Sequence, residues 1–180
     1  MESLLRRAVL HSRIVVGMVA LAGLFLSGLV HVASVLSVDI ESTWPSVWVL
    51  HYALFPIVIL AVLTAVLVAG QKQLNFRAFL TLVAAPALIV LAAAFLYVLA
   101  TFLVLTPLSG SGDPVMVDGG YFFNDHGVMR EVSEEQFHFQ RSVSLRLFSA
   151  VWIYLYLFSV IYLLAARRHW DNVHDLRSRL

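Results

Sequence analysis

The chain has 180 residues, of which 61% are hydrophobic and 13% are charged, and its mean hydropathy is +0.87. A soluble domain of this length cannot bury so much apolar surface, so the composition indicates an integral membrane protein. The formal net charge is +1, which leaves no strong field for binding nucleic acid. Because the chain contains no cysteine, disulfide bonds, cysteine metal sites and thiol catalysis are excluded.

Four long apolar segments follow one another, at residues 14–38, 47–69, 78–105 and 145–166. Each exceeds the roughly 20 residues that a helix needs to cross about 30 Å of hydrocarbon. The first ends in acidic residues without a small-residue cleavage site, so we expect a retained helix rather than a signal peptide. We predict an all-α integral membrane protein: one transmembrane domain over 1–180, built as an antiparallel four-helix bundle.

Basic residues fall on one side of this topology. They are Arg6, Arg7 and Arg13 before the first span, Lys72 and Arg77 in the second loop, and Arg167, Arg168, Arg177 and Arg179 in the tail. The other two loops are acidic. Since cytoplasmic loops collect Lys and Arg, we expect both termini in the cytoplasm of a bacterial cell, with the protein a multi-pass component of the inner membrane.

Small and polar residues recur at helical spacing in two spans. They are Gly17, Ala20, Ser27, Gly28, His31 and Ser34 in the first, and Ala84, Ala87, Ala94 and Thr101 in the third. Such residues let helices approach closely in lipid, so we expect both faces to be buried. Pro56 and Pro86 predict kinks. The aromatic fourth span is expected to contact lipid and the membrane interface or, alternatively, a partner.

The external loop 107–133 is expected to hold a small β-hairpin at 121–132, between the third and fourth helices. Residues 121–123 and 128–132 have strand character, and Asn124 to Gly127 have the composition of a hairpin turn. We expect Leu108 to Pro114 to form a flexible lead-in. Ser133 and Gln136 match a capping box, which predicts that one helix begins here in water and continues into the membrane.

A polar side chain recurs at one depth in all four spans, namely His31, His51, Tyr97 and Arg146. Counted from the basic residues at about 1.5 Å per residue, each lies about 30 Å from the cytoplasmic side. Ionisable groups in a membrane are costly and point to function, although near an interface they can reach water. We leave two interpretations open: a structural polar layer near the outer face, or a ligand, proton or metal site.

The sequence offers two candidate cofactor sites. His31 and His51 could ligate a b-type haem, with Gly28 leaving room and Arg146 meeting a propionate. A divalent metal could instead use Asp125, His126, Glu134 and His138, whose spacing matches no known ligand motif. We predict no bound metal and no cofactor, and we keep haem b as an alternative.

Catalytic motifs are missing from the sequence, which has no Gly-x-Ser-x-Gly, no His-Glu-x-x-His, no phosphate loop and no dinucleotide fingerprint. No carboxylate lies inside a span to relay protons. We therefore predict that the protein is not an enzyme. An oligomeric ion channel or small transporter remains the alternative from a different class.

The layout resembles that of the four-span immunity proteins that protect bacteria from pore-forming bacteriocins. The shared features are the length, the cytoplasmic termini and a longer polar outer loop before the last span. The resemblance implies a non-enzymatic protein that binds or shields against another membrane-active protein; an accessory subunit, or association with a second copy, fits the same plan. We expect partner binding at the outer loop, through Asp125, His126, Glu131, Glu134 and Glu135.

Overall fold

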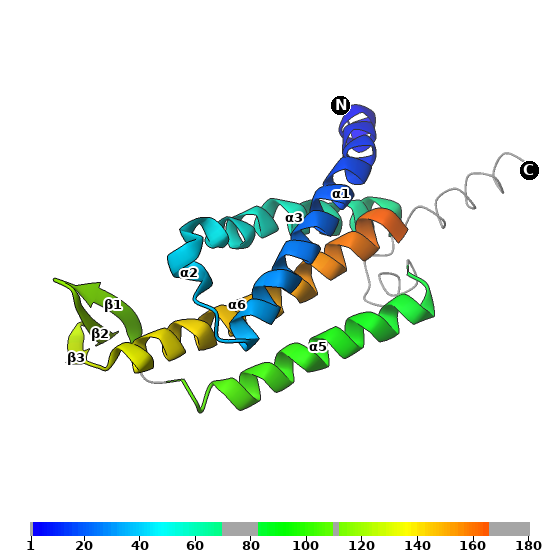
Figure 1. The fold of residues 1–180 in the computed structure, drawn as a ribbon. Helices are drawn as coiled ribbons and strands as arrows, with labels where there is room; N and C mark the ends of the chain where they lie inside the picture. Colours follow the sequence, from blue (N-terminus) through cyan, green and yellow to red (C-terminus); the bar gives the residue numbers. More distant parts are fainter. Residues whose placement is uncertain (1, 70–82, 110–111, 166–180) are drawn as a thin grey trace, which may run out of the picture.

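The computed structural model describes residues 2–69, 83–109 and 112–165, and they are mostly helical. The long helices are α1 (Glu2–Val35), α3 (Val49–Ala69), α5 (Ala85–Leu105) and α6 (Glu134–Val160), the last continued by the π-helical turn η3 (Ile161–Ala165). A short helix α2 (Ile40–Thr43) and a 3₁₀ turn η1 (Pro45–Trp48) connect α1 to α3. Strands β1 (Asp113–Val117), β2 (Gly120–Asp125) and β3 (Val128–Glu131) precede α6, as Figure 1 shows.

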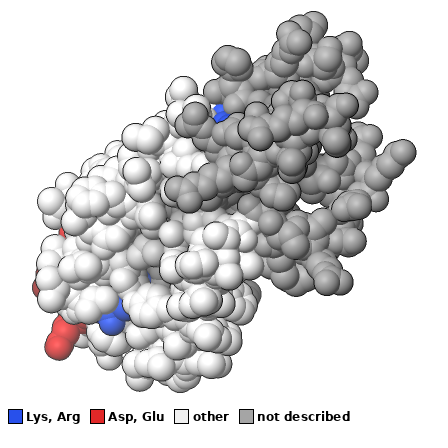
Figure 2. All heavy atoms as spheres, turned by 90° about the vertical axis from the view of Figure 1, so that its right-hand side faces the viewer, with Lys and Arg blue, Asp and Glu red and all other residues white. Residues whose placement is uncertain are grey.

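Four helices are long and apolar enough to cross a membrane, which confirms the predicted number of spans. The apolar segments are Ser12–Val35, Pro45–Val66, Ala85–Leu108 and Glu134–Leu164. In the view of Figure 2 their surface is almost free of charged side chains, and acidic groups appear only near one edge. The predicted start of the third span at 78–82 and the last residue of the fourth, 166, lie outside the described residues.

The kink predicted at Pro86 is wrong, because this residue lies in the first turn of α5. Ala84 has extended backbone (ψ 145°) and forms the N-cap, so the helix begins at Ala85. A proline is tolerated there because the N–H that it lacks would have had no partner within the helix. Pro56, in contrast, lies inside α3 as predicted.

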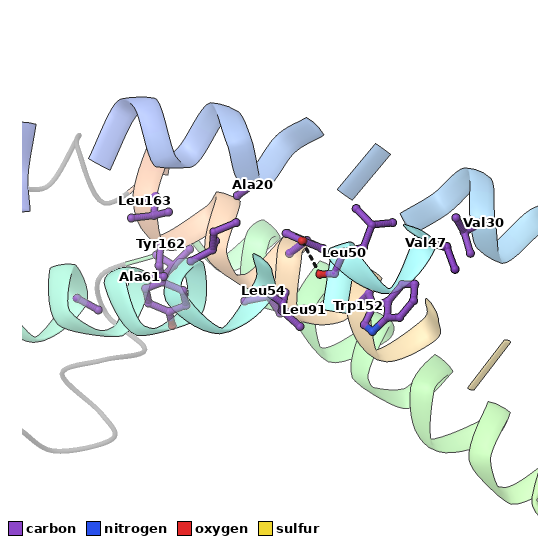
Figure 3. Packing of buried hydrophobic residues seen from close by; sticks show 14 of the residues in the cluster. Ala20, Val30, Val47, Leu50, Leu54, Ala61, Leu91, Trp152, Tyr162 and Leu163 are labelled. Atoms are coloured by element: carbon purple, nitrogen blue, oxygen red, sulfur yellow. Dashed lines mark hydrogen bonds between the residues drawn. The ribbon is translucent and has the colours of Figure 1, made fainter. Parts of the chain in front are cut away.

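Helix α6 is the centre of the molecule, since it contacts α1, α3 and α5, whereas α5 packs mainly against α6 (Figure 1). Trp152, Tyr156 and Tyr162 are at most 1% exposed and join the core shown in Figure 3. The expectation that the fourth span turns its aromatic side chains to lipid is therefore wrong for these three residues. The ring of Tyr156 fills the space beside Gly23 on α1.

The close approach of α1 to α6 depends on glycine. A Cβ atom built on Gly23 would lie 2.4 Å from the ring of Tyr156. That ring is held in place, since its hydroxyl donates a 2.8 Å hydrogen bond to the carbonyl of Leu50 on α3. The bond is drawn as the dashed line near the Leu50 label in Figure 3. A Cβ on Gly28 would meet nothing within 4 Å.

The small-residue faces are only partly as predicted. On α1 the buried members are Gly17, Ala20, Ser27, His31 and Ser34, whereas Gly28 is half-buried. On α5 the half-buried members are Ala87, Ala94 and Thr101, whereas Ala84 is exposed. The two exceptions have simple reasons: the space beside Gly28 is open, and Ala84 precedes the first turn of its helix.

The segment between α5 and α6 forms three antiparallel strands in the order β1-β2-β3 rather than a two-stranded hairpin. The predicted hairpin corresponds to β2 and β3. The prediction missed β1, which includes the end of the expected lead-in and pairs Val115 with Phe122. Both connections are two-residue turns with positive φ throughout, at Asp118 and Gly119 and at His126 and Gly127. Such turns match the natural twist of a hairpin.

Alanine at position 23 should destabilise the protein, whereas alanine at position 28 should not. Gly23→Ala forces a methyl group against the fixed ring of Tyr156, an overpacking that costs about 1–3 kcal/mol. Gly28→Ala makes the same chemical change on the same helix in open space and should be neutral or stabilising by up to about 1 kcal/mol. Thermal unfolding in detergent measures both. Equal melting temperatures for the two variants would contradict the packing described here.

Candidate functional site

Three of the four predicted polar-layer residues come together where α1, α5 and α6 meet. The ring of His31 on α1 lies between two hydroxyl groups: Nδ1 is 2.9 Å from Ser149 Oγ on α6, and Nε2 is 2.5 Å from the Tyr97 hydroxyl on α5. His31 is buried, at 7% exposure. Both ring nitrogens are therefore satisfied by side chains from two other helices, as polar groups within a membrane require.

Arg146 closes the end of α1 in the same region. Its Nη2 donates a 2.6 Å hydrogen bond to the carbonyl of Ser34, in the last turn of that helix. Carbonyls at a helix C-terminus lack partners within the helix and carry partial negative charge. The guanidinium of Arg146 thus places a positive charge at the C-terminal end of α1, whose own last turn has no basic residue. Its Nε is buried and has no hydrogen-bond partner.

His51 does not share this hydrogen-bonded group. Its Nδ1 accepts a 3.0 Å hydrogen bond from the indole N–H of Trp152, which joins α3 to α6. The rings of Trp48 and Phe148 lie edge-on to it, with centroids 6.2 Å and 5.6 Å away. The structure therefore divides the predicted layer into two separate contacts, both of which involve α6.

Tyr97 lies near the middle of the apolar segment Ala85–Leu108, not near its end. The sequence estimate counted helical rise from Arg77, but residues 83 and 84 are not helical and residues 78–82 lie outside the described part of the chain. Because Tyr97 bonds to His31, which is near the end of α1, α5 is displaced along its axis relative to α1. The apolar end of α5 therefore extends beyond the end of α1.

The geometry does not fit axial haem ligation by His31 and His51. An imidazole ligand coordinates iron through one nitrogen and usually donates a hydrogen bond from the other. Both nitrogens of His31 already face hydroxyl groups, and Nδ1 of His51 accepts from Trp152. Arg146, assigned to a propionate in this hypothesis, is used by the carbonyl of Ser34. These contacts match a set of interhelical hydrogen bonds.

Sequence reasoning missed a second polar cluster, which joins the α1–α3 loop to α6. Arg141 on α6 donates from Nε to Glu41 Oε2 at 2.7 Å and from Nη1 to Ser42 Oγ at 3.2 Å. Glu41 also accepts a 2.5 Å bond from the indole of Trp48. Asp39 caps α2 by accepting the N–H of Ser42 at 3.1 Å. Only the types of residue could be read from the sequence: Asp39 and Glu41 are the acidic residues of that loop, and Arg141 is one of two arginines between the third and fourth spans.

Asp39 also lies close to His138, with 2.8 Å between Oδ2 and Nδ1. The two atoms are at ion-pair distance but are not aligned for a hydrogen bond, since Nδ1 has no geometrically acceptable partner. Burial raises the pKa of Asp39, but the hydrogen bonds from Ser42 and the nearby charges of Arg141 and His138 outweigh it and hold this pKa below its usual value. The carboxylate is thus ionised at neutral pH.

The predicted partner-binding residues lie on the sheet and on the first turn of α6. Asp125 and His126 are at the β2–β3 turn, where their side chains pair at 2.7 Å and the histidine side chain is 98% exposed. Glu131 ends β3, and Glu134 and Glu135 begin α6, all three exposed. They belong to one polar unit, which we define as β1–β3 together with residues 133–141.

This polar unit is tied to α6 by several contacts. The capping box is confirmed: Ser133 accepts the N–H of Gln136 at 3.2 Å, and the Gln136 side chain accepts the N–H of Ser133. The Tyr121 ring lies 5.0 Å from that of Phe137, and its hydroxyl donates to Glu134 at 3.0 Å. That hydrogen bond to a carboxylate raises the pKa of Tyr121. Phe123 is buried beneath the guanidinium of Arg130.

The four residues considered for a divalent metal fall into two pairs. His126 pairs with Asp125 in the turn, and His138 Nε2 lies 3.7 Å from Glu134 on α6. Within residues 2–69, 83–109 and 112–165, no three His, Cys, Asp or Glu side chains are grouped so that they could hold a metal ion.

Comparisons of this chain with protein-family models, with curated proteins and with solved structures found no match.

Removing one hydroxyl group should reveal the contribution of the His31 contact. Tyr97→Phe leaves Nε2 of His31 without its partner, and we expect a loss of about 0.6–2 kcal/mol, the range found for hydrogen bonds between membrane helices. Tyr52→Phe is the matched control, because Tyr52 is 69% exposed on α3. Unfolding in detergent measures the stability of both variants against that of the parent protein. If both variants unfold like the parent protein, the Tyr97–His31 contact contributes nothing to holding α5.

Proposed function

We propose that this is a non-enzymatic, multi-pass protein of a bacterial inner membrane that uses its polar unit to bind another protein acting at or in that membrane. In this role it shields the cell against a membrane-active protein or serves as an accessory subunit of a membrane complex. Both termini are cytoplasmic in this proposal, and the polar unit faces outward. The proposal agrees with the resemblance of the predicted layout to that of four-span immunity proteins.

The observation that carries the proposal is that the polar unit is mounted firmly on the membrane-spanning helices. A short antiparallel sheet is only marginally stable alone in water. Here the ring of Tyr121 packs on Phe137 of α6, and on the same helix Arg141 pairs with Glu41 and His138 lies beside Asp39, both in the α1–α3 loop. Binding residues concentrate where loops are held on a rigid scaffold. The contacts described above supply such a scaffold.

The charge of the polar unit favours a basic partner. Its carboxylates belong to Asp113, Asp118, Asp125, Glu131, Glu134 and Glu135. The cations are Arg130, which covers Phe123, and Arg141, which is paired with Glu41. An acidic surface of this kind raises the association rate and specificity for a basic protein more than the final affinity.

Neutralising the acidic side chains should weaken binding without unfolding the protein. We expect Asp125→Asn combined with Glu131→Gln, Glu134→Gln and Glu135→Gln to reduce the amount of partner captured from native membranes. The difference from the parent protein should grow at low salt, where surface charges are screened least. Glutamine at 134 can still accept from Tyr121, so the melting temperature should change little.

The control for this experiment is Ser133→Ala, which removes the capping hydroxyl but no charge. It should lower stability by about 1 kcal/mol and leave partner capture intact below the melting temperature. If the fourfold variant captures as much partner as the parent at every salt concentration, the acidic surface is not a recognition element and the polar unit only covers the helix ends.

The proposed orientation has a separate test. Reporter fusions at residues 1 and 180 should both be active in the cytoplasm, whereas a reporter inserted after Gly112 should be active outside. The reason is that the basic clusters lie before the first span, in the second loop and in the tail. A cytoplasmic reporter at Gly112 would reverse the orientation and exclude an extracellular partner.

A further inference from the structure

The two edges of the small sheet differ in their hydrogen-bonding groups. In a two-residue hairpin the residues that flank the turn exchange both backbone bonds, and alternate residues then face away from the neighbouring strand. The turns at 118–119 and 126–127, together with the observed register, fix this alternation. It places Pro114 and Met116 on the free edge of β1, and Met129 and Glu131 on the free edge of β3. The Val132 N–H donates a 2.9 Å hydrogen bond to the Tyr121 carbonyl, as this alternation of inward- and outward-facing residues requires.

The β1 edge is protected against further pairing. Pro114 has no N–H, so the position that should donate to an added strand cannot do so. Proline at a free edge is one of the devices by which proteins prevent unwanted strand addition.

The β3 edge has no such protection. Met129 and Glu131 each keep an N–H and a carbonyl, and all four residues of the strand are exposed. No hydrogen bond from these two edge amides to another described residue is present. An extended segment could therefore add to the sheet here through backbone hydrogen bonds, a recurring mode of peptide recognition.

Side chains along β3 indicate the chemistry of that segment. Glu131 lies at the end next to Glu134 and Glu135, which favours a basic residue opposite it. Met129, two residues earlier on the same face as Phe122, favours an apolar residue. Arg130 is directed to the other face, over the Phe123 ring. The complementary strand thus has a basic and an apolar residue two positions apart, with a neutral residue between.

A second copy of this chain fits the edge poorly. Antiparallel pairing of two β3 strands that joins Met129 of one copy to Glu131 of the other places the two Arg130 residues directly opposite each other. Like charges in that position destabilise a strand pair. Centring the pair on Glu131 instead opposes two carboxylates. Centring it on Met129 avoids like charges but sets Glu131 opposite Gly127 of the turn, so only three residues of each strand could pair. The edge is therefore better matched to a different, basic strand.

We infer that β3 is the docking edge of the polar unit, at which an extended, basic segment of a partner protein pairs as a fourth strand. This inference rests on the proposed function and specifies how the partner is bound. It assigns recognition to the backbone of Met129 and Glu131, and it assigns selectivity for a basic residue to the carboxylates around Glu131.

The test uses the full-length protein in lipid nanodiscs and a short synthetic peptide, Thr-Thr-Lys-Thr-Val-Thr-Thr. The peptide is made with N-methyl groups either on Lys and Val, whose amides would face β3, or on the neighbouring threonines, whose amides face away. Methylation of the facing amides should weaken binding at least about tenfold, since each lost hydrogen bond contributes about 1 kcal/mol. Methylation of the other amides should change affinity much less.

A second arm changes the protein. Met129→Pro removes the edge N–H and should abolish peptide binding, whereas Met129→Ala keeps the N–H and should retain most of it. The parent ladder does not use the Met129 amide, so proline is tolerated by the sheet itself. In the parent protein the amides of Met129 and Glu131 should exchange hydrogen rapidly and become protected when the peptide is added.

The outcomes separate the docking edge from the acidic surface. Equal binding of both methylated peptides, with loss of binding on Glu131→Gln, would overturn the edge inference and leave recognition by charge standing. Sensitivity to methylation without sensitivity to Glu131→Gln would support the edge and count against the acidic surface. No binding of any peptide at millimolar concentration would overturn pairing at β3, while the capture experiment on the fourfold variant would still decide the proposed function.

Discussion

The structure depends on helix α6, which begins directly after the small polar sheet and continues through the centre of the molecule. Every cluster of interhelical polar contacts described here involves α6: Ser149 with His31, Arg146 with the end of α1, Trp152 with His51, and Arg141 with Glu41. In hydrocarbon there is no water to satisfy such groups, so they must find one another. Their partners on α1, α3 and the connecting loop are thereby fixed relative to α6, and so is the sheet.

Packing on α6 reinforces these polar contacts. Gly23 on α1 lies directly against the buried ring of Tyr156, and Gly17 lies against Leu163 and Leu164. Without a hydrophobic drive between helices in lipid, such contact area and a few hydrogen bonds hold membrane helices together. Helix α5 has less of both, since it packs mainly on α6 and reaches α1 through the Tyr97 hydroxyl. It is the helix whose position depends most on a single polar contact.

Much of the architecture could be read from local sequence. The number of spans follows from apolar length, and the capping box at Ser133 follows from a four-residue pattern. The prediction failed where tertiary context decides. Trp152 and Tyr156 are of a residue type common at the lipid interface, but they are buried against residues far away in the sequence, Trp152 against Trp48 and His51 and Tyr156 against Gly23. Strand β1 was missed because its proline argues against a strand unless the strand is known to lie at a sheet edge.

The candidate site was predictable in part. Depth counting selected His31, Tyr97 and Arg146, which do lie in one region, but it could not show that His51 turns to Trp152 instead. The ion pair of Glu41 with Arg141 joins residues 100 positions apart, and nothing in the local sequence selects that partner. For the proposed function this missed pair matters most, because it joins α6 next to the sheet to the α1–α3 loop.

Rigid mounting of the polar unit can be measured as a distance distribution by pulsed electron spin resonance. The chain contains no cysteine, so His126→Cys and Leu36→Cys introduce two unique labelling sites, both on exposed side chains. In lipid nanodiscs we expect one narrow distance distribution, which broadens when Arg141→Gln removes the contact with Glu41. A broad distribution in the otherwise unchanged protein would contradict rigid mounting, because the sheet would then move independently of the membrane-spanning helices.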